Sequence, residues 1–589
     1  MHKIQFAINI RLAIVTIFSV ALLTFIGCQK KAGSDVQIIP PSENPYATAV
    51  SIEITTATPE PTDVPTPTPE PTPTPVPTPH AVDASQPYNW GFETELEVNG
   101  FVVDSYDRTT PISFGSGDDY SQLNGVIGFR SNNYRQNAAY GTASTANERL
   151  TQIWNVATAS MPKGEGGSGT WTGSGWTGQP ILVEWPAQTK QIMNMYDWAK
   201  EKDGLVEVIY ATMDGNVYFL DLESGEATRD KLNIGMPFKG AGALDPRGYP
   251  ILYLGSGDSY PDDDSKITRA MAYSLVDYTR LYEFGKKPDS FALRIWHAYD
   301  SGPLVDAKTD TLIYPGENGI LYTIHLNTYF DVTTGTLTMN PDDVVRLRYH
   351  ANRTGENAYW LGYEGSCAVW NGFAYLTENS GLMHCVDLNT MEVKWVQDIH
   401  DDTNASPALE VISETEAYLY VGNTLDNTID ASNQGTTSIF KIDAMTGEIV
   451  WQYSKTIGTT KNVTGGVMGS AIIGHGDMEG LVITSFASYD GETNEGVVVA
   501  LNRQTGDLVW SRQLSAYAWS SPIAIYSDNG KDCIIQGNNH GNLYLIDGAS
   551  GVILDTLKLG GNMEASPAAF NDIIVIGTRS KGIFGVRVS

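Results

Sequence analysis

Positively charged residues are scarce in this chain. It has 37 lysines and arginines against 68 aspartates and glutamates, which gives a formal net charge of −31 over 589 residues. A surface with this excess of negative charge repels phosphate groups. The composition therefore argues against nucleic acid or an anionic membrane face as a partner, and it favours a well-solvated extracellular surface.

Cysteine is scarcer still, with four residues in the whole chain. No two are adjacent, and none stands in a Cys-x-x-Cys-His motif, which excludes that type of haem attachment. Cys367 and Cys385 are predicted to lie on strands about 10 Å apart, which is too far for a disulfide. Apart from Cys28, we expect three buried thiols and no disulfide framework.

Motifs for metals and phosphates are also missing. The nine histidines form no His-Glu-x-x-His pair, so a zinc site is not expected. The Gly-rich stretch 164–178 is followed by no Gly-Lys-Ser/Thr, so we interpret it as a loop and not as a phosphate cradle. The acidic runs 262–264 and 490–495 could hold Ca²⁺, but neither matches an EF-hand, and solvated loops are favoured. We predict no metal and no cofactor.

The N-terminus, in contrast, has the features of a secretion signal. Residues 1–27 carry Lys3 and Arg11 as their only charges, ahead of the apolar run 12–26, which is typical of a signal peptide. The segment Phe25-Ile-Gly-Cys28 resembles a bacterial lipobox, although Phe25 stands where Leu is usual. The resemblance implies that Cys28 becomes the lipidated mature N-terminus, held in the bilayer by two acyl chains. An uncleaved signal anchor is the alternative.

Residues 28–87 are rich in proline and threonine and show no hydrophobic periodicity. They predict a disordered linker that contains a stiff polyproline II spacer. About fifty such residues would span on the order of 150 Å. The spacer resembles those of Gram-positive surface lipoproteins, which implies anchoring at the extracellular face of the plasma membrane. We expect a monomer.

Residues 88–589 are organised by one repeated segment. Each clear copy has an opening residue, usually Gly, then Asp or Asn six positions later, and usually Gly four positions after that. The apolar runs between these positions predict strands, and Asp-x-x-x-Gly predicts a hairpin in which Gly supplies a positive φ. The copies open at Gly215, Gly381, Thr437, Gly496 and Gly541, with a degenerate sixth at Gly319. Trp395, Trp451 and Trp510 end three of the copies, and we expect them to pack between neighbouring units.

With the strand pair upstream of each copy, the unit is four antiparallel strands, which indicates a β-propeller. The eight predicted first strands open at Gln179-Pro180, Ala241-Gly242, Gly302-Pro303, Ser366-Cys367, Ser406-Pro407, Ser470-Ala471, Ser521-Pro522 and Ser566-Pro567. We therefore predict an all-β fold with eight blades, and seven blades is the alternative because blades 2 and 3 are irregular. The last unit lacks a fourth strand, and we predict that the segment 149–156 supplies it and closes the ring.

The tryptophan-bearing strand after Asp-x-x-Thr-Gly resembles the repeat of PQQ-type (pyrroloquinoline quinone-type) propellers. Gly128-Phe-Arg-Ser-Asn-Asn-Tyr-Arg135 resembles the Phe-Arg-Gly-Asn opening that often precedes such propellers. The family includes quinoprotein dehydrogenases, assembly scaffolds and uncharacterised surface proteins. The resemblance would imply a quinone enzyme only if the chain had the adjacent cysteines of those dehydrogenases, and it has none.

Two classes of function follow. The favoured hypothesis is a non-enzymatic binding or scaffold module outside the cell, with a glycan or a surface protein as partner. The alternative is an extracellular enzyme acting on polysaccharide through paired carboxylates at the channel mouth. Residues just before each first strand should ring that mouth, and they mix carboxylates with aromatic rings, which suits a sugar. The predicted ligand-binding residues are Trp176, Tyr299, Asp300, Glu364, Trp519 and Glu564.

Overall fold

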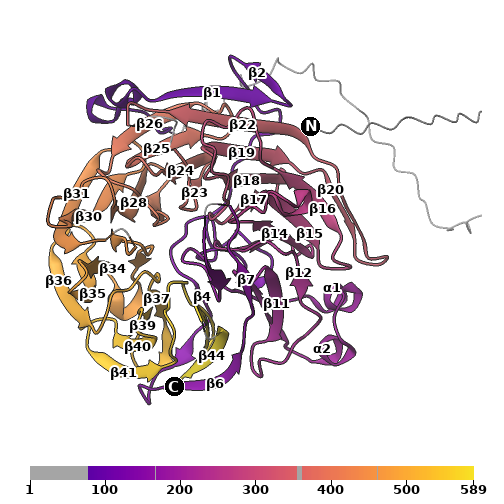
Figure 1. Ribbon diagram of the computed structural model, residues 1–589, viewed down its shortest axis with the longest axis vertical. Coiled ribbons are helices and arrows are strands. Elements are labelled where there is room, and N and C mark those ends of the chain that lie inside the picture. The colour runs from indigo at the N-terminus through magenta and orange to yellow at the C-terminus, as the bar shows by residue number, and fades with distance from the viewer. Residues whose placement is uncertain (1–76, 166, 354–360, 461, 581) are drawn as a thin grey trace, which may run out of the picture. The chain divides into compact units, whose positions relative to one another are not determined.

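The computed structural model describes residues 77–165, 167–353, 361–460, 462–580 and 582–589. The signal segment, Cys28 and the proline-rich run up to residue 76 lie outside the described residues. Residues from Thr74 onward form one compact unit. In it, eight antiparallel sheets are arranged around a central axis (Figure 1), so the predicted eight-bladed β-propeller is confirmed and the seven-bladed alternative is wrong.

Each blade is four strands that run in order from the central channel outward. Blades 1 and 2 are β9 (Ile181–Glu184), β10 (Val206–Ala211), β11 (Asn216–Asp221), β12 (Leu232–Asn233), and β13 (Ala243–Leu244), β14 (Ile251–Gly255), β15 (Ala270–Ser274), β16 (Arg280–Phe284). Blades 3 and 4 are β17 (Leu304–Asp306), β18 (Thr311–Pro315), β19 (Ile320–His325), β22 (Asp342–His350), and β23 (Ala368–Trp370), β24 (Phe373–Thr377), β25 (Leu382–Asp387), β26 (Val393–Asp398). All four inner strands follow the predicted openings.

The second half of the ring repeats this plan. Blades 5 and 6 are β27 (Ala408–Ser413), β28 (Glu416–Gly422), β30 (Gln434–Asp443), β31 (Ile449–Gly458), and β33 (Ile472–Ile473), β34 (Leu481–Tyr489), β35 (Asn494–Asn502), β36 (Leu508–Leu514). Blades 7 and 8 are β37 (Ile523–Ile525), β39 (Cys533–Gly537), β40 (Asn542–Asp547), β41 (Ile553–Lys558), and β42 (Ala568–Phe570), β43 (Ile573–Thr578), β44 (Gly582–Val588), β6 (Leu150–Val156).

Shorter elements decorate the blades. They are the hairpins β7 (Ser160–Pro162) with β8 (Thr170–Thr172) and β20 (Thr328–Asp331) with β21 (Thr336–Met339), the strands β29 (Thr424–Leu425), β32 (Gly465–Gly466), β5 (Ala143–Ser144) and β38 (Ser527–Asn529), and the helices α1 (Ala187–Ile192) and α2 (Asp197–Glu201). Among the described residues no helix is long and apolar enough to cross a membrane.

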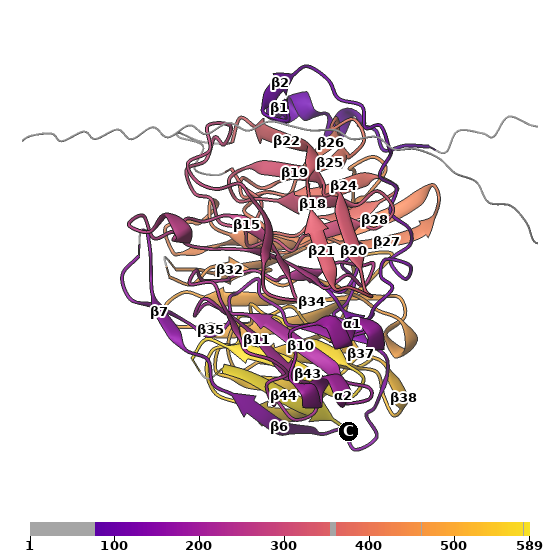
Figure 2. The same ribbon diagram turned by 90° about the vertical axis from the view of Figure 1, so that its right-hand side faces the viewer.

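The ring is closed by chain ends that are far apart in sequence. β6 lies antiparallel to β44, with Trp154 opposite Gly585 and Leu150 opposite Val588 (Figure 2). This confirms the predicted closure, in which the N-terminal segment supplies the strand that the last blade lacks. A second N-terminal addition was not predicted: β1 (Glu93–Val98) and β2 (Phe101–Val103) extend blade 3 outward from β22.

The repeated hairpin forms as the residue pattern predicts. In blade 5 the Asp443 carboxylate accepts hydrogen bonds from the amides of Met445 and Thr446, and Gly447 has a φ of 73°. Across the blade interface the Trp395 indole donates to the Ala444 carbonyl at 3.0 Å. A Cβ on Gly447 would lie 2.7 Å from the Trp395 ring. Glycine is therefore required here both for the positive φ and for the close approach of the tryptophan.

The same contact recurs at three other interfaces. Trp154, Trp451 and Trp510 each donate an indole hydrogen bond to a carbonyl of the next blade, those of Leu222, Arg503 and Gly548. Trp395 is fully buried and Trp451 is 8% exposed, whereas Trp510 is only partly buried. The tryptophans therefore have the structural role that the repeat predicts, and the Trp154 contact joins the last blade to the first.

One end of the channel is filled by the segment 124–140, which passes through the middle of the ring in Figure 1. We call this segment the plug. Arg130 and Arg135 are both fully buried in it. Arg130 donates to the carbonyls of Pro522 and Ala471 in blades 7 and 6, and Arg135 donates to those of Cys367 and Gly302 in blades 4 and 3.

The plug also bonds directly to the inner strands. β3 (Asn124–Val126) pairs with β9, and β4 (Ala139–Tyr140) pairs with β42. Asn137 exchanges two hydrogen bonds with Ala524 of β37, both 2.9 Å long. Further hydrogen bonds from the plug reach Leu244 of blade 2, Val369 of blade 4 and Leu409 of blade 5. The plug, which contains the segment that resembles the family's opening motif, thus satisfies polar groups in all eight blades.

A belt of serine hydroxyls lies across the channel at the start of the inner strands. Each hydroxyl accepts a hydrogen bond from the backbone amide of the preceding blade, over 2.7 to 3.1 Å. The serines are Ser366, Ser406, Ser470, Ser521 and Ser566, and Ser566 then donates its own amide to the Gly178 carbonyl of blade 1. The serines that open these inner strands therefore join one blade to the next.

Two smaller expectations can be compared with the structure. The three cysteines among the described residues, Cys367, Cys385 and Cys533, are free and buried, as predicted. The packed region begins earlier than the expected boundary at residue 88, because the His80 amide donates to the Met445 carbonyl and the Ser85 hydroxyl donates to the Thr446 carbonyl. The last residues of the predicted linker therefore lie against blade 5.

Candidate ligand-binding site at the channel mouth

Residues that precede the inner strands meet at one end of the channel, opposite the plug. The hairpins that join second to third strands reach the same end, because antiparallel strands alternate in direction. We call this end the mouth. Its residues come from blades 1 to 5 and from blades 7 and 8, and they divide into a cationic centre with tryptophans, a group of carboxylates and a glutamate–arginine ion pair.

Lys239 is the centre of the first group. It is 4% exposed, and its ammonium lies 5.4, 5.0 and 4.9 Å from the ring centres of Trp171, Trp176 and Trp296. Such distances allow cation–π attraction. The ammonium forms no hydrogen bond or ion pair with the residues that the structure describes. Trp176 and Trp296 are partly exposed, so they form the outer surface of this cluster.

Asp300 lies close enough to Lys239 to feel its charge. The residue is 1% exposed, and neither carboxylate oxygen has a hydrogen-bond partner among the described residues. The pKa of Asp300 is raised to about 7, because burial and the charge of Glu317 raise it more than the charges of Lys239 and Arg294 lower it. An unpartnered carboxylate of this kind is costly, and native proteins keep few such groups.

Glu317 and Glu364 form a hydrogen-bonded carboxyl pair next to Asp300. Burial and then the charge of Glu317 hold the pKa of Glu364 well above its usual range. Burial alone would raise the pKa of Glu317, but hydrogen bonds from Glu364 and from the Trp296 indole (2.7 Å), with the charge of Arg294, bring it below its usual value. The Asn404 amide also donates to Glu364.

Asp402 continues the acidic group into blade 5. It accepts a hydrogen bond of 2.8 Å from Asn379, whose carbonyl oxygen accepts one of 3.0 Å from Arg294. Burial raises the pKa of Asp402 to about 8, although the hydrogen bond from Asn379 opposes the rise. At neutral pH the mouth therefore holds fewer negative charges than its count of carboxyl groups suggests.

The remaining predicted residues lie on blades 7 and 8. Glu564 pairs with Arg579 at 3.2 Å, and the Arg579 guanidinium lies 5.9 Å from the Trp171 ring centre. The Trp519 indole donates to the Thr464 carbonyl and its ring centre lies 5.6 Å from that of Tyr517. Glu564 and Trp519 are thus linked to the Lys239 cluster through neighbouring side chains.

Tyr299 is placed elsewhere. It is 1% exposed, its hydroxyl donates to the Gly285 carbonyl, and its ring packs at 5.6 Å against Tyr314 in the core between blades 2 and 3. Successive residues of an extended chain point to opposite sides, so Tyr299 enters the core while Asp300 faces the mouth. The other five predicted residues, Trp176, Asp300, Glu364, Trp519 and Glu564, lie at the mouth. That they bind a ligand stays a prediction.

Several mouth residues were not predicted from the sequence. They are Trp171, Arg294, Trp296, Glu317, Asp402 and Arg579. Glu317 had a signal, because it stands two residues before the repeat's opening residue Gly319, in the hairpin that reaches this face. Trp171 and Trp296 come from irregular loops, and no periodic pattern marks them.

The donor set does not fit the quinone and calcium of the quinoprotein enzymes. Cys385 and Cys533 lie on β25 and β39, and Cys367 directly precedes β23, so no adjacent pair could cover a quinone. Within the described ranges no three His, Cys, Asp or Glu side chains are placed to hold a metal ion. What the mouth does offer is a cation, a carboxylate with free acceptors and partly exposed indoles, which together can bind a polar ligand.

Comparisons with known proteins agree on the fold. Residues 346–586 match the family model described as outer membrane protein assembly factor BamB. No curated protein sequence matches the chain.

Solved structures cover more of it. Quinohemoprotein alcohol dehydrogenase from Comamonas testosteroni is 12% identical with a TM-score of 0.50, covering 81% of this chain and 83% of that one. Quinohemoprotein alcohol dehydrogenase ADHIIG from Pseudomonas putida HK5 is 10% identical with a TM-score of 0.48, covering 81% and 82%. BamB from Moraxella catarrhalis is 15% identical with a TM-score of 0.42, covering 65% and 94%. The family-model match and the Comamonas testosteroni structure confirm the resemblance to PQQ-type propellers in fold.

Proposed function

We propose that the protein is a non-enzymatic binding module that holds a hydroxyl-rich ligand, such as a cell-envelope glycan, at the channel mouth. The observation that carries the proposal is Asp300, a buried carboxylate with two free acceptor oxygens beside the free donors of Lys239. Sugar hydroxyls can donate to the first group and accept from the second. The indoles of Trp176 and Trp296 supply the apolar surface on which the face of a sugar ring packs.

An enzyme acting on polysaccharide is the weaker alternative. Glycosidases keep their two carboxyl groups about 5 to 9.5 Å apart, so that the sugar or a water fits between them. Glu317 and Glu364 are in direct hydrogen-bond contact. This pair is therefore too close for that chemistry, which supports binding over hydrolysis.

For its location, we propose a lipid anchor on Cys28 at the outer face of the plasma membrane. The support is the lipobox-like segment and the proline-rich spacer. Cys28→Ala should release the protein into the medium or leave its signal uncut. A Cys28→Ala protein that still partitions into detergent like the wild type would remove the anchor from the proposal.

The binding proposal is tested with the purified region 77–589 on an array of glycans and peptidoglycan fragments. Asp300→Asn and Trp176→Ala should each weaken binding at least tenfold. Tyr299→Phe is the matched control, because it changes the adjacent residue but only inside the core. Binding that survives both mouth substitutions, or no binding by any fragment, would contradict the proposal. If a fragment is consumed instead of bound, the enzymatic alternative replaces it.

A further inference from the structure

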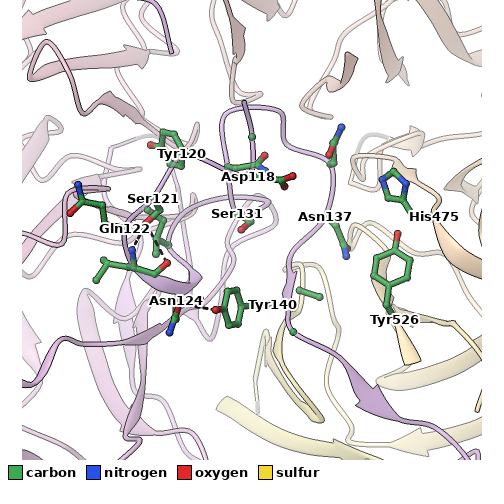
Figure 3. A pocket seen from close by; sticks show the side chains of 18 of the residues that line it. Asp118, Tyr120, Ser121, Gln122, Asn124, Ser131, Asn137, Tyr140, His475 and Tyr526 are labelled. Atoms are coloured by element: carbon green, nitrogen blue, oxygen red, sulfur yellow. Dashed lines mark hydrogen bonds between the residues drawn. The ribbon is translucent and has the colours of Figure 1, made fainter. Parts of the chain in front are cut away.

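A second site lies at the plugged end of the channel. A cavity of about 460 Å³ opens there between the plug and the loops that follow β33 and β37 (Figure 3). His475 and Tyr526 follow inner strands, whereas the mouth residues precede them, so the cavity and the mouth are at opposite ends. The volume is in the range of small-molecule sites in proteins.

The wall of the cavity is rigid. Asn137 and Gln136 line it, and both are fixed by hydrogen bonds to the inner strands of blades 7 and 5. Tyr140 is held on one face by the Phe570 ring at 4.9 Å, and its hydroxyl donates to Asn124 at 2.7 Å. Side chains held in this way do not lose further conformational entropy when a ligand binds.

Other groups of the lining have unused hydrogen-bonding capacity. The side chains of Asp118, Gln122 and Ser131 form no hydrogen bond with the described residues, and the side-chain amide oxygen of Gln136 accepts none from them. Ser131 has a φ of 71°, a conformation that is unusual outside glycine. The lining therefore combines free donors with free acceptors around aromatic rings, and the labelled side chains in Figure 3 surround the space.

The charges around the cavity narrow the ligand class. No lysine or arginine lines it, and Asp118 is its one carboxylate, so an anionic ligand would meet no fixed positive charge. Five of the lining residues are asparagine or glutamine, whose amides both donate and accept. Neutral hydroxyl groups, which also donate and accept, are the chemistry that matches such a lining.

We propose that this cavity binds a neutral saccharide unit, with Asp118, Gln122 and Ser131 as hydrogen-bonding residues and the Tyr140 ring as the packing surface. The site is separate from the mouth and goes beyond the function proposed for it. A surface protein with sites at both ends of its channel could engage two sugar residues, or two chains, at once.

The test is titration of the 77–589 region with glucose, galactose, mannose, N-acetylglucosamine and their common disaccharides, followed by calorimetry and by saturation-transfer NMR. We expect at least one saccharide to bind. Gln122→Ala and Ser131→Gly should each weaken that binding about three- to tenfold, and the double variant should weaken it more. Ser131→Gly is chosen because glycine keeps the positive φ, so the fold should be preserved.

Two controls separate this site from the mouth. Asp119→Asn changes the exposed residue next to Asp118. The Asp119 carboxylate accepts a hydrogen bond from the Ser116 hydroxyl and does not line the cavity, so this variant should leave binding unchanged. Asp300→Asn should remove binding at the mouth only, so the binding that Gln122→Ala and Ser131→Gly weaken should persist in it. If no saccharide in the panel binds, or if binding is lost in Asp300→Asn but not in the cavity variants, this proposal is wrong, and the second result would support the mouth alone.

Discussion

The two ends of the channel treat buried polar groups in opposite ways. At the plug, Arg130 and Arg135 are fully buried, and each donates to several carbonyls. At the mouth, the Asp300 carboxylate is equally buried and bonds nothing that the structure describes. The plug uses charge to stabilise the fold, whereas the mouth keeps charge available at a cost in stability. A buried carboxylate that keeps its acceptors free is typical of a functional site, and of these two ends it lies at the mouth.

The largest effect should come from breaking the plug. Arg130→Ala removes hydrogen bonds to four carbonyls of the plug and of blades 6 and 7 and leaves them buried without partners. We expect a loss of roughly 4–8 kcal/mol in the free energy of unfolding, measured by denaturant titration. Arg130→Lys should recover only part of it, because one ammonium cannot replace the planar fork. A loss as small as that of Arg587→Ala, which breaks an exposed ion pair, would contradict this role.

The blade interfaces should rank next. Trp395→Ala should cost about 3–5 kcal/mol, because a fully buried ring and its hydrogen bond to Ala444 are lost together. Trp510→Ala should cost less, since that ring is partly exposed. Thermal unfolding of the two variants compares them. Equal losses would mean that burial does not set the strength of these contacts.

Asp300→Asn tests whether the buried charge at the mouth lowers the stability of the fold. Asparagine keeps the shape but removes the buried charge, so we expect the protein at pH 8 to gain about 1–3 kcal/mol in stability. The same substitution should lose ligand binding. A variant that is less stable than the wild type would show that the carboxylate has a structural role.

Stability should fall between pH 6.5 and pH 8. The pKa values of Asp300, Glu378 and Asp402 are raised to about 7, 7 and 8, mainly by burial, while in the unfolded chain they return to about 4. The folded state therefore holds more protons, and stability is lost as pH rises through the folded values, by about 1 kcal/mol per pH unit for each group. Burial lowers the pKa of His384 to about 3, so this residue makes stability rise with pH. That rise takes place below about pH 6.5, where the histidine is protonated in the unfolded chain. A flat profile over this window would contradict the burial of these acids.

The smallest expected effect is at the belt between the two ends. Ser406→Ala removes one hydroxyl acceptor and leaves the Ser366 amide without its partner, at a cost of about 1–2 kcal/mol. Binding at either end should be unchanged. Denaturant titration measures the first effect, and a large loss of binding would show that the belt positions the mouth residues.

Most of the fold could be predicted because it repeats. Asp443 and Gly447 form the hairpin that their spacing indicates. The last blade has no fourth strand after Val588, and this absence correctly predicted that β6 completes it. β1 was missed because it belongs to no repeat and its place on β22 is fixed only by tertiary contact. At the mouth, counting back from each opening located Asp300 and Glu364. Tyr299 was misplaced because adjacent residues of an extended chain point to opposite sides. Sequence spacing alone does not say which of two adjacent residues points to the mouth.

The serine belt has a consequence for how such a ring can change in size. From blade 3 to blade 8 the joints run in the same sense, because a backbone amide of one blade donates to the serine hydroxyl of the next. Blades 4 to 7 therefore carry both halves of an identical connector. A duplicate of one of these blades would arrive with its own connector and could dock in a single orientation, so gene duplication can lengthen the ring without inventing a new interface. Where the last blade meets the first, the Ser566 amide donates to the Gly178 carbonyl in place of a hydroxyl.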